Sequence, residues 1–403
     1  MDFGVVARSG TLLGDHPIPI DVLRPTERAT NLAQGFRDAV QDTAYHQEWM
    51  VTDRPIPVEV VDELAEVACL CGLDRRPEER AAIHDAIFGT DAEAEPSFEP
   101  AQDPSEAVLQ RRRSVAHYLS IVRERPSVVS SEADYRQALW SMVDVEGEEH
   151  RLVAGQWSAL IAKDVWQEAL CSVWAEFCCR GLDRTRATGR GLTWQETKDM
   201  AEAMVSGPPL LAAGERTSSL LQRLVPGGLS VTDDDGISLE VATASLEELR
   251  AWTEDECSAT SGLIVLLELA QRMRKRSGAG WMMASHVESG WQPSVAAVAA
   301  GLEVHLTHNP RIGDTLWWLV SSFILPVHER IAYSKFPELT FRFRWEEGLL
   351  RFQDLGVGRF PLAAIRNAPL ALLTHDLGFW SRDDTDSAVL TESGNAFLAE
   401  TFQ

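Results

Sequence analysis

Apolar residues recur at intervals of three and four along most of this chain, which is the pattern of helices with a buried face. The strongest series lies between Glu148 and Arg180 and includes Val153, Trp157 and Phe177. Its apolar residues cover more than one stripe of the helix, so we expect this helix to be packed on several sides. The segment is predicted to be the central pillar of a helical body.

The same periodicity predicts further helices, several of which start at a proline or at a capping serine or threonine. They run from Pro25 to Val40, Val58 to Leu73, Pro77 to Phe88, Ser105 to Arg123, Ser131 to Val143, Thr193 to Met204 and Ser245 to Arg276. We expect the last of these to be a second long helix with a basic end. Residues 278–290 are predicted to form a loop and residues 295–300 a short helix.

The pattern changes in the last hundred residues. A strongly apolar helix is expected from Leu316 to Ile331, buried where the body meets this stretch. Residues 340–345 then alternate between aromatic and arginine side chains, which predicts a half-buried strand, and residues 349–352 return as its hairpin partner. Two helices starting at prolines, two short strands and a final helix complete the chain.

The end of this stretch resembles the wing of winged-helix proteins. The resemblance rests on Leu390-Thr391-Glu392-Ser393-Gly394, an LT-x-x-G turn, followed by apolar Phe397 and Leu398. It implies either DNA binding or protein docking, because winged helices do both. The nearby charges are almost balanced, whereas wings that read DNA are usually more basic, so the resemblance favours docking.

The predicted fold is therefore mostly α: a multi-helix body with a C-terminal winged-helix-like α+β module. Residues 93–104 contain three prolines and little to bury, which indicates a linker or exposed loop. We expect three regions. They are an N-terminal helical region with an acidic face and this linker (1–104), a central helical body (105–309) and the winged-helix-like module (310–403).

Charge argues against a protein that coats nucleic acid, since the net charge is −24. The segment from Asp42 to Glu106 holds seventeen acidic residues against four arginines, which indicates a solvated face or a docking site for a basic partner. Only four of the 37 basic residues are lysine, a bias typical of a GC-rich bacterium. Hydrophobic content is 45%, but no apolar run is long enough for a membrane span.

The six cysteines lie within helical patterns and lack metal or disulfide spacing, and no secretion signal is evident. We therefore expect a reducing, cytoplasmic location.

Arginine clusters are the candidate contacts for nucleic acid or for a partner. The structural alternatives are a solvated helix face for the first cluster and a favourable helix C-terminus for the second. The candidate residues are Arg111, Arg112, Arg113, Arg272, Arg274, Lys275, Arg276, Arg342, Arg344, Arg351 and Arg366.

Local signatures of chemistry are missing from the sequence. His84-Asp85 and His375-Asp376 each resemble the metal-binding pair of phosphohydrolases, but the further histidine and aspartate that this family needs cannot be placed. There is no nucleophile elbow, phosphate-binding glycine loop or zinc-protease spacing. We predict no cofactor and no metal site, assign no catalytic residue, and favour a protein that is not an enzyme.

The leading hypothesis is a non-catalytic adaptor or scaffold subunit of a bacterial multi-protein complex, for example one that acts on nucleic acid in anti-phage defence. Its partners would be proteins, with DNA reached directly or through the complex, and no membrane. One alternative is a DNA-binding winged-helix regulator, whose binding would weaken steeply with salt. The other is a metal-dependent hydrolase with a dispersed His/Asp/Glu site.

Overall fold

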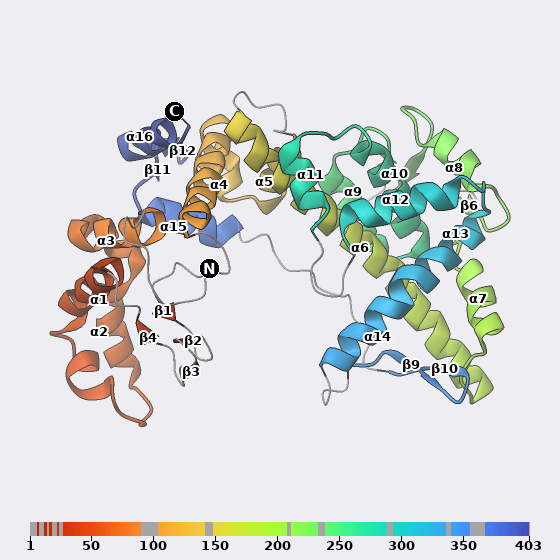
Figure 1. The fold of residues 1–403 in the computed structure, drawn as a ribbon, viewed down its shortest axis with the longest axis horizontal. Helices are drawn as coiled ribbons and strands as arrows, with labels where there is room; N and C mark the ends of the chain where they lie inside the picture. The colour runs from red at the N-terminus through yellow and green to blue at the C-terminus, as the bar shows by residue number, and fades with distance from the viewer. Residues whose placement is uncertain are drawn as a thin grey trace. The chain divides into compact units, whose positions relative to one another are not determined.

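Helices dominate the computed structural model, and its sheets are small antiparallel pairs of strands (Figure 1). This confirms the mostly-α prediction; a winged-helix module is not confirmed. No helix in the part of the chain that the structure describes is long and apolar enough to cross a membrane. The structure describes four two-residue strands before residue 27 and then residues 27–89, 104–141, 148–207, 211–232, 238–287, 293–335, 340–354 and 367–402.

Contacts divide the chain into two compact units. The first unit contains Met1–Tyr135 together with Ile365–Gln403, and the second contains Arg136–Ala364. The stretch expected to form one C-terminal module is thus shared between the two units. The three regions expected from the sequence are a different division, and they stay a prediction.

The first unit joins N-terminal helices to the end of the chain. Helix α3 contacts both α1 and α4, while α4 also contacts strand β12 and helix α16. The strand pairs β1–β4, β2–β3 and β11–β12 are antiparallel. Its elements are β1 (Val6–Ala7), β2 (Leu12–Leu13), β3 (His16–Pro17), β4 (Val22–Leu23), α1 (Glu27–Val40), η1 (Tyr45–Trp49), α2 (Val58–Ala68), η2 (Leu70–Arg75), α3 (Pro77–Phe88), α4 (Pro104–Glu124), η3 (Pro126–Val129), α15 (Asn367–Asp376), β11 (Trp380–Arg382), β12 (Ala388–Leu390) and α16 (Glu392–Thr401).

An aromatic cluster holds the N- and C-terminal segments of this unit together. The rings of Phe88 and Phe397 lie 4.9 Å apart, and those of Phe379 and Phe397 lie 4.7 Å apart. Thr391, from the LT-x-x-G turn, caps α16 by accepting a hydrogen bond from the Gly394 N–H at 3.1 Å. A β-carbon at Gly394 would collide with the Phe379 carbonyl, so this turn requires glycine for close packing.

The second unit is built around one long helix. Its elements are α6 (Glu148–Thr188), α7 (Trp194–Glu202), β5 (Ser206–Gly207), β6 (Leu211–Ala212), α8 (Thr217–Arg223), β7 (Ser230–Thr232), β8 (Ser238–Glu240), α9 (Leu246–Glu256), α10 (Ala259–Met273), α11 (Ala279–Ser285), α12 (Val295–Leu306), α13 (Ile312–Leu319), η5 (Val320–Ile324), α14 (Leu325–Ser334), β9 (Phe343–Glu346) and β10 (Leu349–Phe352); α5 (Glu132–Ser141) contains the division between the units.

Helix α6 has 41 residues and contacts α9, α10, α11 and strand β10. Ile161, Ala162, Asp164 and Trp166 are all buried although they lie around more than half of the helix circumference, which confirms the expected packing on several sides. An ion network adds to this contact. The buried Arg136 donates to Asp164 on α6 at 2.9 Å and to Glu247 on α9 at 2.8 Å. Burial raises the pKa of Asp164 in spite of Arg136, so the carboxylate depends on that pairing.

Three of the predicted elements are wrong. The helix expected from Val58 to Leu73 ends at Ala68, because Cys69 is extended, and the separate 3-10 helix η2 follows. The second long helix is two helices, α9 and α10, because Cys257 adopts a left-handed conformation (φ 45°) and Ser258 caps a new helix. The predicted loop at 278–290 contains helix α11, whose Gly280 leaves no room for a β-carbon beside the Leu152 backbone of α6. Small residues that looked like a loop instead permit close helix packing.

The apolar helix after Pro310 is confirmed, with one irregular turn. The π-helical turn η5 separates α13 from α14 just before Pro326. Proline lacks an N–H and its ring would collide with the carbonyl four residues earlier, so a wider turn relieves that conflict. Leu316 and Leu319 are buried as expected, but Trp317 is only half-buried.

Cys69 and Cys71 are joined in a disulfide in the structure, contrary to the expectation that no pair had disulfide spacing. Both cysteines are exposed; Cys69 lies between α2 and η2, and Cys71 is the second residue of η2. Arg76 donates to the Cys69 carbonyl and forms an ion pair with Glu79, so this corner is tied to the start of α3.

We expect Gly262→Ala to destabilise the second unit. A β-carbon at Gly262 of α10 would collide with the Ala169 carbonyl of α6, and overpacking of this kind costs about 1–3 kcal/mol. Urea unfolding followed by circular dichroism measures the loss. Gly301→Ala in α12 is the control, since its β-carbon would meet only the Trp318 ring at 3.4 Å. An equal effect of both substitutions would contradict this account of the α6–α10 contact.

Candidate interaction surface

The hairpin of β9 and β10 presents one face to the core and one to solvent. Phe343 pairs with Phe352, and Trp345 pairs with Leu350. The turn residues Glu347 and Gly348 both have positive φ, which is the geometry of a type I′ hairpin. Phe343, Leu350 and Phe352 are buried, so the aromatic alternation read from the sequence describes the inner face correctly.

Two contacts fix this hairpin to α6 and α14. A β-carbon at Gly181 of α6 would overlap the Phe352 ring, so glycine at this position makes room for the aromatic side chain. Just before β9, the Arg342 N–H donates to Nε2 of His328 at 3.1 Å. Burial and the Arg342 guanidinium lower the pKa of His328 to about 4, which keeps the ring neutral and able to accept this bond.

Two arginines stand opposite each other on the solvent face. Arg344 pairs with Arg351 across the hairpin, and both form ion pairs with the single carboxylate of Glu346. Both arginine side chains are close to half exposed. One carboxylate between two guanidinium groups leaves this face with an excess of positive charge.

Three tryptophans lie beside the hairpin. The Trp194 ring is 4.8 Å from that of Trp317, edge to face, and 5.6 Å from that of Trp345. These residues come from the start of α7, from α13 and from β9. Trp194 is 49% exposed, while the other two are half-buried, so the cluster reaches the surface.

The position of Trp194 is set by a helix cap. Thr193 and Glu196 form a reciprocal capping box at the start of α7, and Glu196 also pairs with Arg190 at 2.6 Å. Hydrogen bonds from Arg190 and from Thr193 lower the pKa of Glu196 to about 2. The residues just before this cap are tied to the hairpin, because Leu192 exchanges backbone hydrogen bonds with Leu350 at 2.7 and 2.8 Å.

We call Trp194, Trp317, Trp345, Arg344 and Arg351 the tryptophan–arginine surface. Leu192 pairs with the outer edge of β10, so within the described residues β9 is the strand with an open edge. Because side chains alternate along a strand, Trp345 and the two guanidinium groups lie on opposite faces of the hairpin, with the open edge of β9 between them. These groups can bind a peptide or protein by packing, by ion pairing and by strand addition.

The cluster Arg111, Arg112 and Arg113 is half-buried in the first unit. Arg111 donates to the Ile87 carbonyl at 3.1 Å, and Arg112 donates to the Phe88 carbonyl at 3.4 Å. These bonds satisfy carbonyls at the end of α3. Arg112 also lies over the Phe397 ring, 5.1 Å from its centroid. The first two arginines thus have structural contacts in the aromatic cluster.

The cluster from Arg272 to Arg276 is divided in the same way. Arg272 pairs with Glu268 at 2.7 Å and donates to the Val241 carbonyl, and Arg276 lies 3.8 Å from the centroid of the Trp140 ring. Arg274 is exposed and pairs with Glu303 at 2.5 Å. Lys275 is exposed and has no ion pair with a described residue.

Of the last four candidates, Arg342, Arg344 and Arg351 come together on one hairpin, and Arg366 lies outside the described residues. Sequence reasoning missed Trp194, although it recognised Thr193 as a helix cap. Trp194 is the first residue of α7 and lies outside the buried series of Thr197, Met200 and Ala201, which is the signal that could have marked it as exposed.

The histidine–aspartate pairs have ordinary surroundings. His84 packs against Phe88, Phe379 and Phe397, and burial lowers its pKa. His375 Nδ1 lies 3.2 Å from the carboxylate of its neighbour Asp376. Among the described residues, no group of three or more His, Cys, Asp or Glu side chains is arranged to hold a metal ion.

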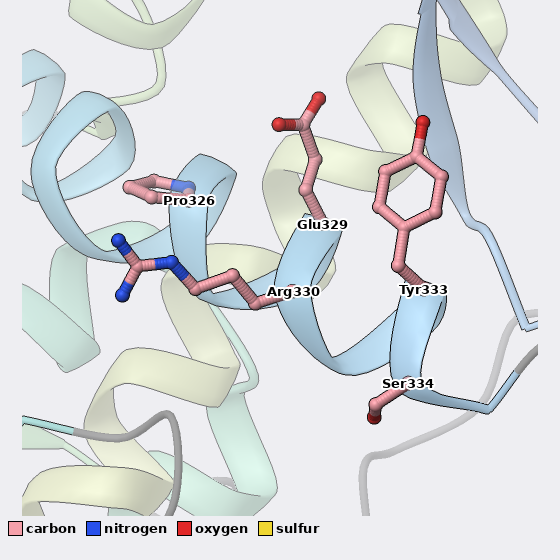
Figure 2. A pocket seen from close by; sticks show the side chains of 5 residues that line it. All are labelled: Pro326, Glu329, Arg330, Tyr333 and Ser334. Atoms are coloured by element: carbon pink, nitrogen blue, oxygen red, sulfur yellow. The ribbon is translucent and has the colours of Figure 1, made fainter.

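A surface hollow lies along α14. Its lining residues are Pro326, Glu329, Arg330, Tyr333 and Ser334, all from one face of that helix. In Figure 2 the Glu329 carboxylate and the Tyr333 hydroxyl point one way and the Arg330 guanidinium points another. These polar groups do not converge on one point, so the hollow is a weaker candidate binding site than the tryptophan–arginine surface.

Comparison with protein-family models, with curated proteins and with solved structures found no match. The geometry of this chain therefore carries the functional argument alone.

We expect His328→Gln to flatten the pH dependence of stability. The pKa of His328 is about 4 when folded, below its ordinary 6.5, so its stabilising contribution is full above pH 6.5 and is lost as pH falls toward 4. Glutamine can accept the Arg342 N–H bond but does not titrate. Urea unfolding should show that the free energy of unfolding falls by about 1–3 kcal/mol less between pH 7 and pH 4 in this variant than in the unaltered chain. The exposed His308→Gln is the control, and an unchanged slope in His328→Gln would contradict the assignment.

We expect Arg276→Ala to destabilise the protein, whereas Lys275→Ala does not. Arg276 donates to the Trp140 carbonyl at 2.9 Å and covers its ring, contacts worth about 1–3 kcal/mol together. Lys275 is exposed, and such substitutions usually stay within about 0.5 kcal/mol. Thermal or urea unfolding compares the two variants. Equal stabilities of the two variants would contradict a structural role for Arg276 and keep it among the candidate contact residues.

Proposed function

We propose that this protein is a non-catalytic adaptor subunit of a bacterial multi-protein complex and that it binds a protein partner through the tryptophan–arginine surface. The observation that carries the proposal is the exposed Trp194, whose ring packs on Trp317 and Trp345 beside the hairpin that carries Arg344 and Arg351. Tryptophan and arginine are the residues most enriched among those that dominate interface energies. A set of anchors of this kind exposed together is typical of a docking site.

The cluster is organised before any partner arrives. Trp194 rests on the rings of Trp317 and Trp345, and the capping box at Thr193 fixes the start of its helix. Rigid aromatic anchors lose little conformational entropy on binding, which favours affinity. Because its neighbours hold the exposed Trp194 ring in place, we assign this ring to the binding of a protein partner.

The charge of the surface defines the partner. Arg344 and Arg351 share one carboxylate, so an acidic group on the partner would gain an ion pair without breaking an existing core contact. An extended segment could also add to the open edge of β9. We propose an acidic and aromatic or aliphatic segment as the ligand of this surface.

The winged-helix-like interpretation belongs to this proposal as a docking element of the first unit. It is supported by the order helix, hairpin and helix in α15, β11, β12 and α16, and by the capping of α16 at Thr391. A complex that acts on nucleic acid, such as an anti-phage system, is the setting that we propose for the adaptor. Capture of the partner would identify that complex.

We expect Trp194→Ala and Arg351→Glu each to weaken partner binding by about tenfold or more, since central tryptophan and arginine anchors contribute more than 1 kcal/mol. The measurement is quantitative mass spectrometry of proteins captured from the host cell by the full chain and by each variant. Met282→Ala, an exposed residue of α11 in the same unit, is the matched control. Circular dichroism checks that all variants are folded.

Two results would contradict the proposal. One is a set of captured proteins that is the same for Trp194→Ala and for the unaltered chain. The other is tight binding of labelled duplex DNA that falls steeply with salt and is lost in Arg351→Glu, which would favour the DNA-binding regulator.

A further inference from the structure

Helix α2 has no fully buried residue. Its half-buried residues Val60, Leu64, Val67 and Ala68 recur at helical spacing and form the inward face, and α2 contacts α1 and η1. Glu63 accepts a hydrogen bond from the Ala44 N–H at 3.2 Å, which ties α2 to the start of η1. The helix is therefore held on one side only.

A second apolar stripe, exposed to solvent, runs beside this inward face. Val58, Val61 and Ala65 are exposed and follow the spacing i, i+3 and i+7, so they lie in one row. Val58 is 64% exposed and Val61 is 45% exposed. Met50, Val51 and Ile56, in the segment leading into α2, are exposed as well, which extends the apolar area.

Acidic residues border this stripe along one flank. Glu59, Asp62 and Glu66 follow one another at intervals of three and four, and none forms an ion pair with a described residue. Like charges at these spacings repel each other and destabilise an isolated helix. Cations from a binding partner would relieve this repulsion while the partner's apolar side chains cover the valines.

We propose that this α2 face, defined as Val58, Val61 and Ala65 with Glu59, Asp62 and Glu66, binds a basic amphipathic helix of another protein. The inference rests on the proposed adaptor function and adds a second surface, of opposite charge to the first. The partner helix would present an apolar row to the valines and lysine or arginine side chains to the carboxylates. Binding of this kind buries an apolar groove or stripe and is guided by charge.

The negative charge of the α2 face disfavours two other ligands, a second copy of this chain and an anionic membrane. A second copy of this chain docked face to face would bring Glu59, Asp62 and Glu66 against the same three carboxylates. A membrane surface with anionic lipids would be repelled by the same groups. A helix with cationic and apolar side chains complements both the apolar stripe and the row of carboxylates on this face.

The experiment measures a defined probe binding to the full chain. The probe is a fluorescein-labelled synthetic peptide with leucines at i, i+3, i+4 and i+7 and lysines at the remaining positions. A peptide of the same composition with the leucines scattered controls for charge alone. We expect binding of the amphipathic peptide by fluorescence anisotropy, with at least about tenfold weaker binding of the scattered one.

Variants assign the binding to α2. The double substitution Val58→Ser and Val61→Ser removes apolar surface without changing charge, and we expect it to weaken binding about tenfold. Reversal of the three acids (Glu59→Lys, Asp62→Lys and Glu66→Lys) should weaken binding further and reduce its salt dependence. Val304→Ser is the matched control, because Val304 is 63% exposed on α12 of the other unit. Circular dichroism checks folding of each variant.

Several results would overturn the inference: no binding of the amphipathic peptide, equal binding of both peptides, or equal binding by the unaltered chain and the serine double variant. Concentration-dependent dimers lost in that variant would assign the face to a second copy, and vesicle binding lost in it would assign the face to lipid. Trp194→Ala separates the two surfaces, since it should leave peptide binding unchanged. Failure at α2 therefore leaves the tryptophan–arginine surface untouched, and the reverse also holds.

Discussion

The packing of α6 is the constraint on which the second unit depends. A helix of 41 residues is about 60 Å long, and its apolar residues cover more than one face. Such a helix is stable in water only if several neighbours cover it, and α9, α10, α11 and the β9–β10 hairpin do so. The hairpin that carries Arg344 and Arg351 is thus positioned by the same contacts that bury Phe177 and Phe352. The packing of the hairpin on α6 therefore does two things: it buries apolar side chains of α6, and it places Arg344 and Arg351 at the surface.

Local rules predicted most of the helices, because the signals they use lie within a few residues. Ser245 and Thr193 were recognised as caps and do form capping boxes, and Pro77 begins α3 as expected. The break at Cys257 escaped prediction because a left-handed cysteine has no sequence signal of the strength that glycine gives. Helix α11 escaped because its Gly280 looks like a loop residue until the backbone of α6 is beside it.

The roles of the arginines could not be predicted, because they depend on neighbours far away in the sequence. Arg112 serves a carbonyl at Phe88, and Arg276 serves a carbonyl at Trp140. A guanidinium group has five donors and can satisfy carbonyls at helix ends as readily as it can bind phosphate. An adjacent run of arginines is therefore weak support for an external ligand. Among the described residues, the hairpin brings Arg344 and Arg351, from two different strands, together on an exposed face.

The two candidate surfaces differ in charge, and this difference limits how the protein can be used. The α2 face is acidic in the first unit, and the tryptophan–arginine surface carries excess positive charge in the second. A partner selected by one surface would be repelled by the other, since like charges across an interface oppose binding. Specificity of this kind needs no additional recognition element. Under the two proposals each unit would bind a different ligand, and two such sites are what an adaptor needs and a protein with one binding site lacks.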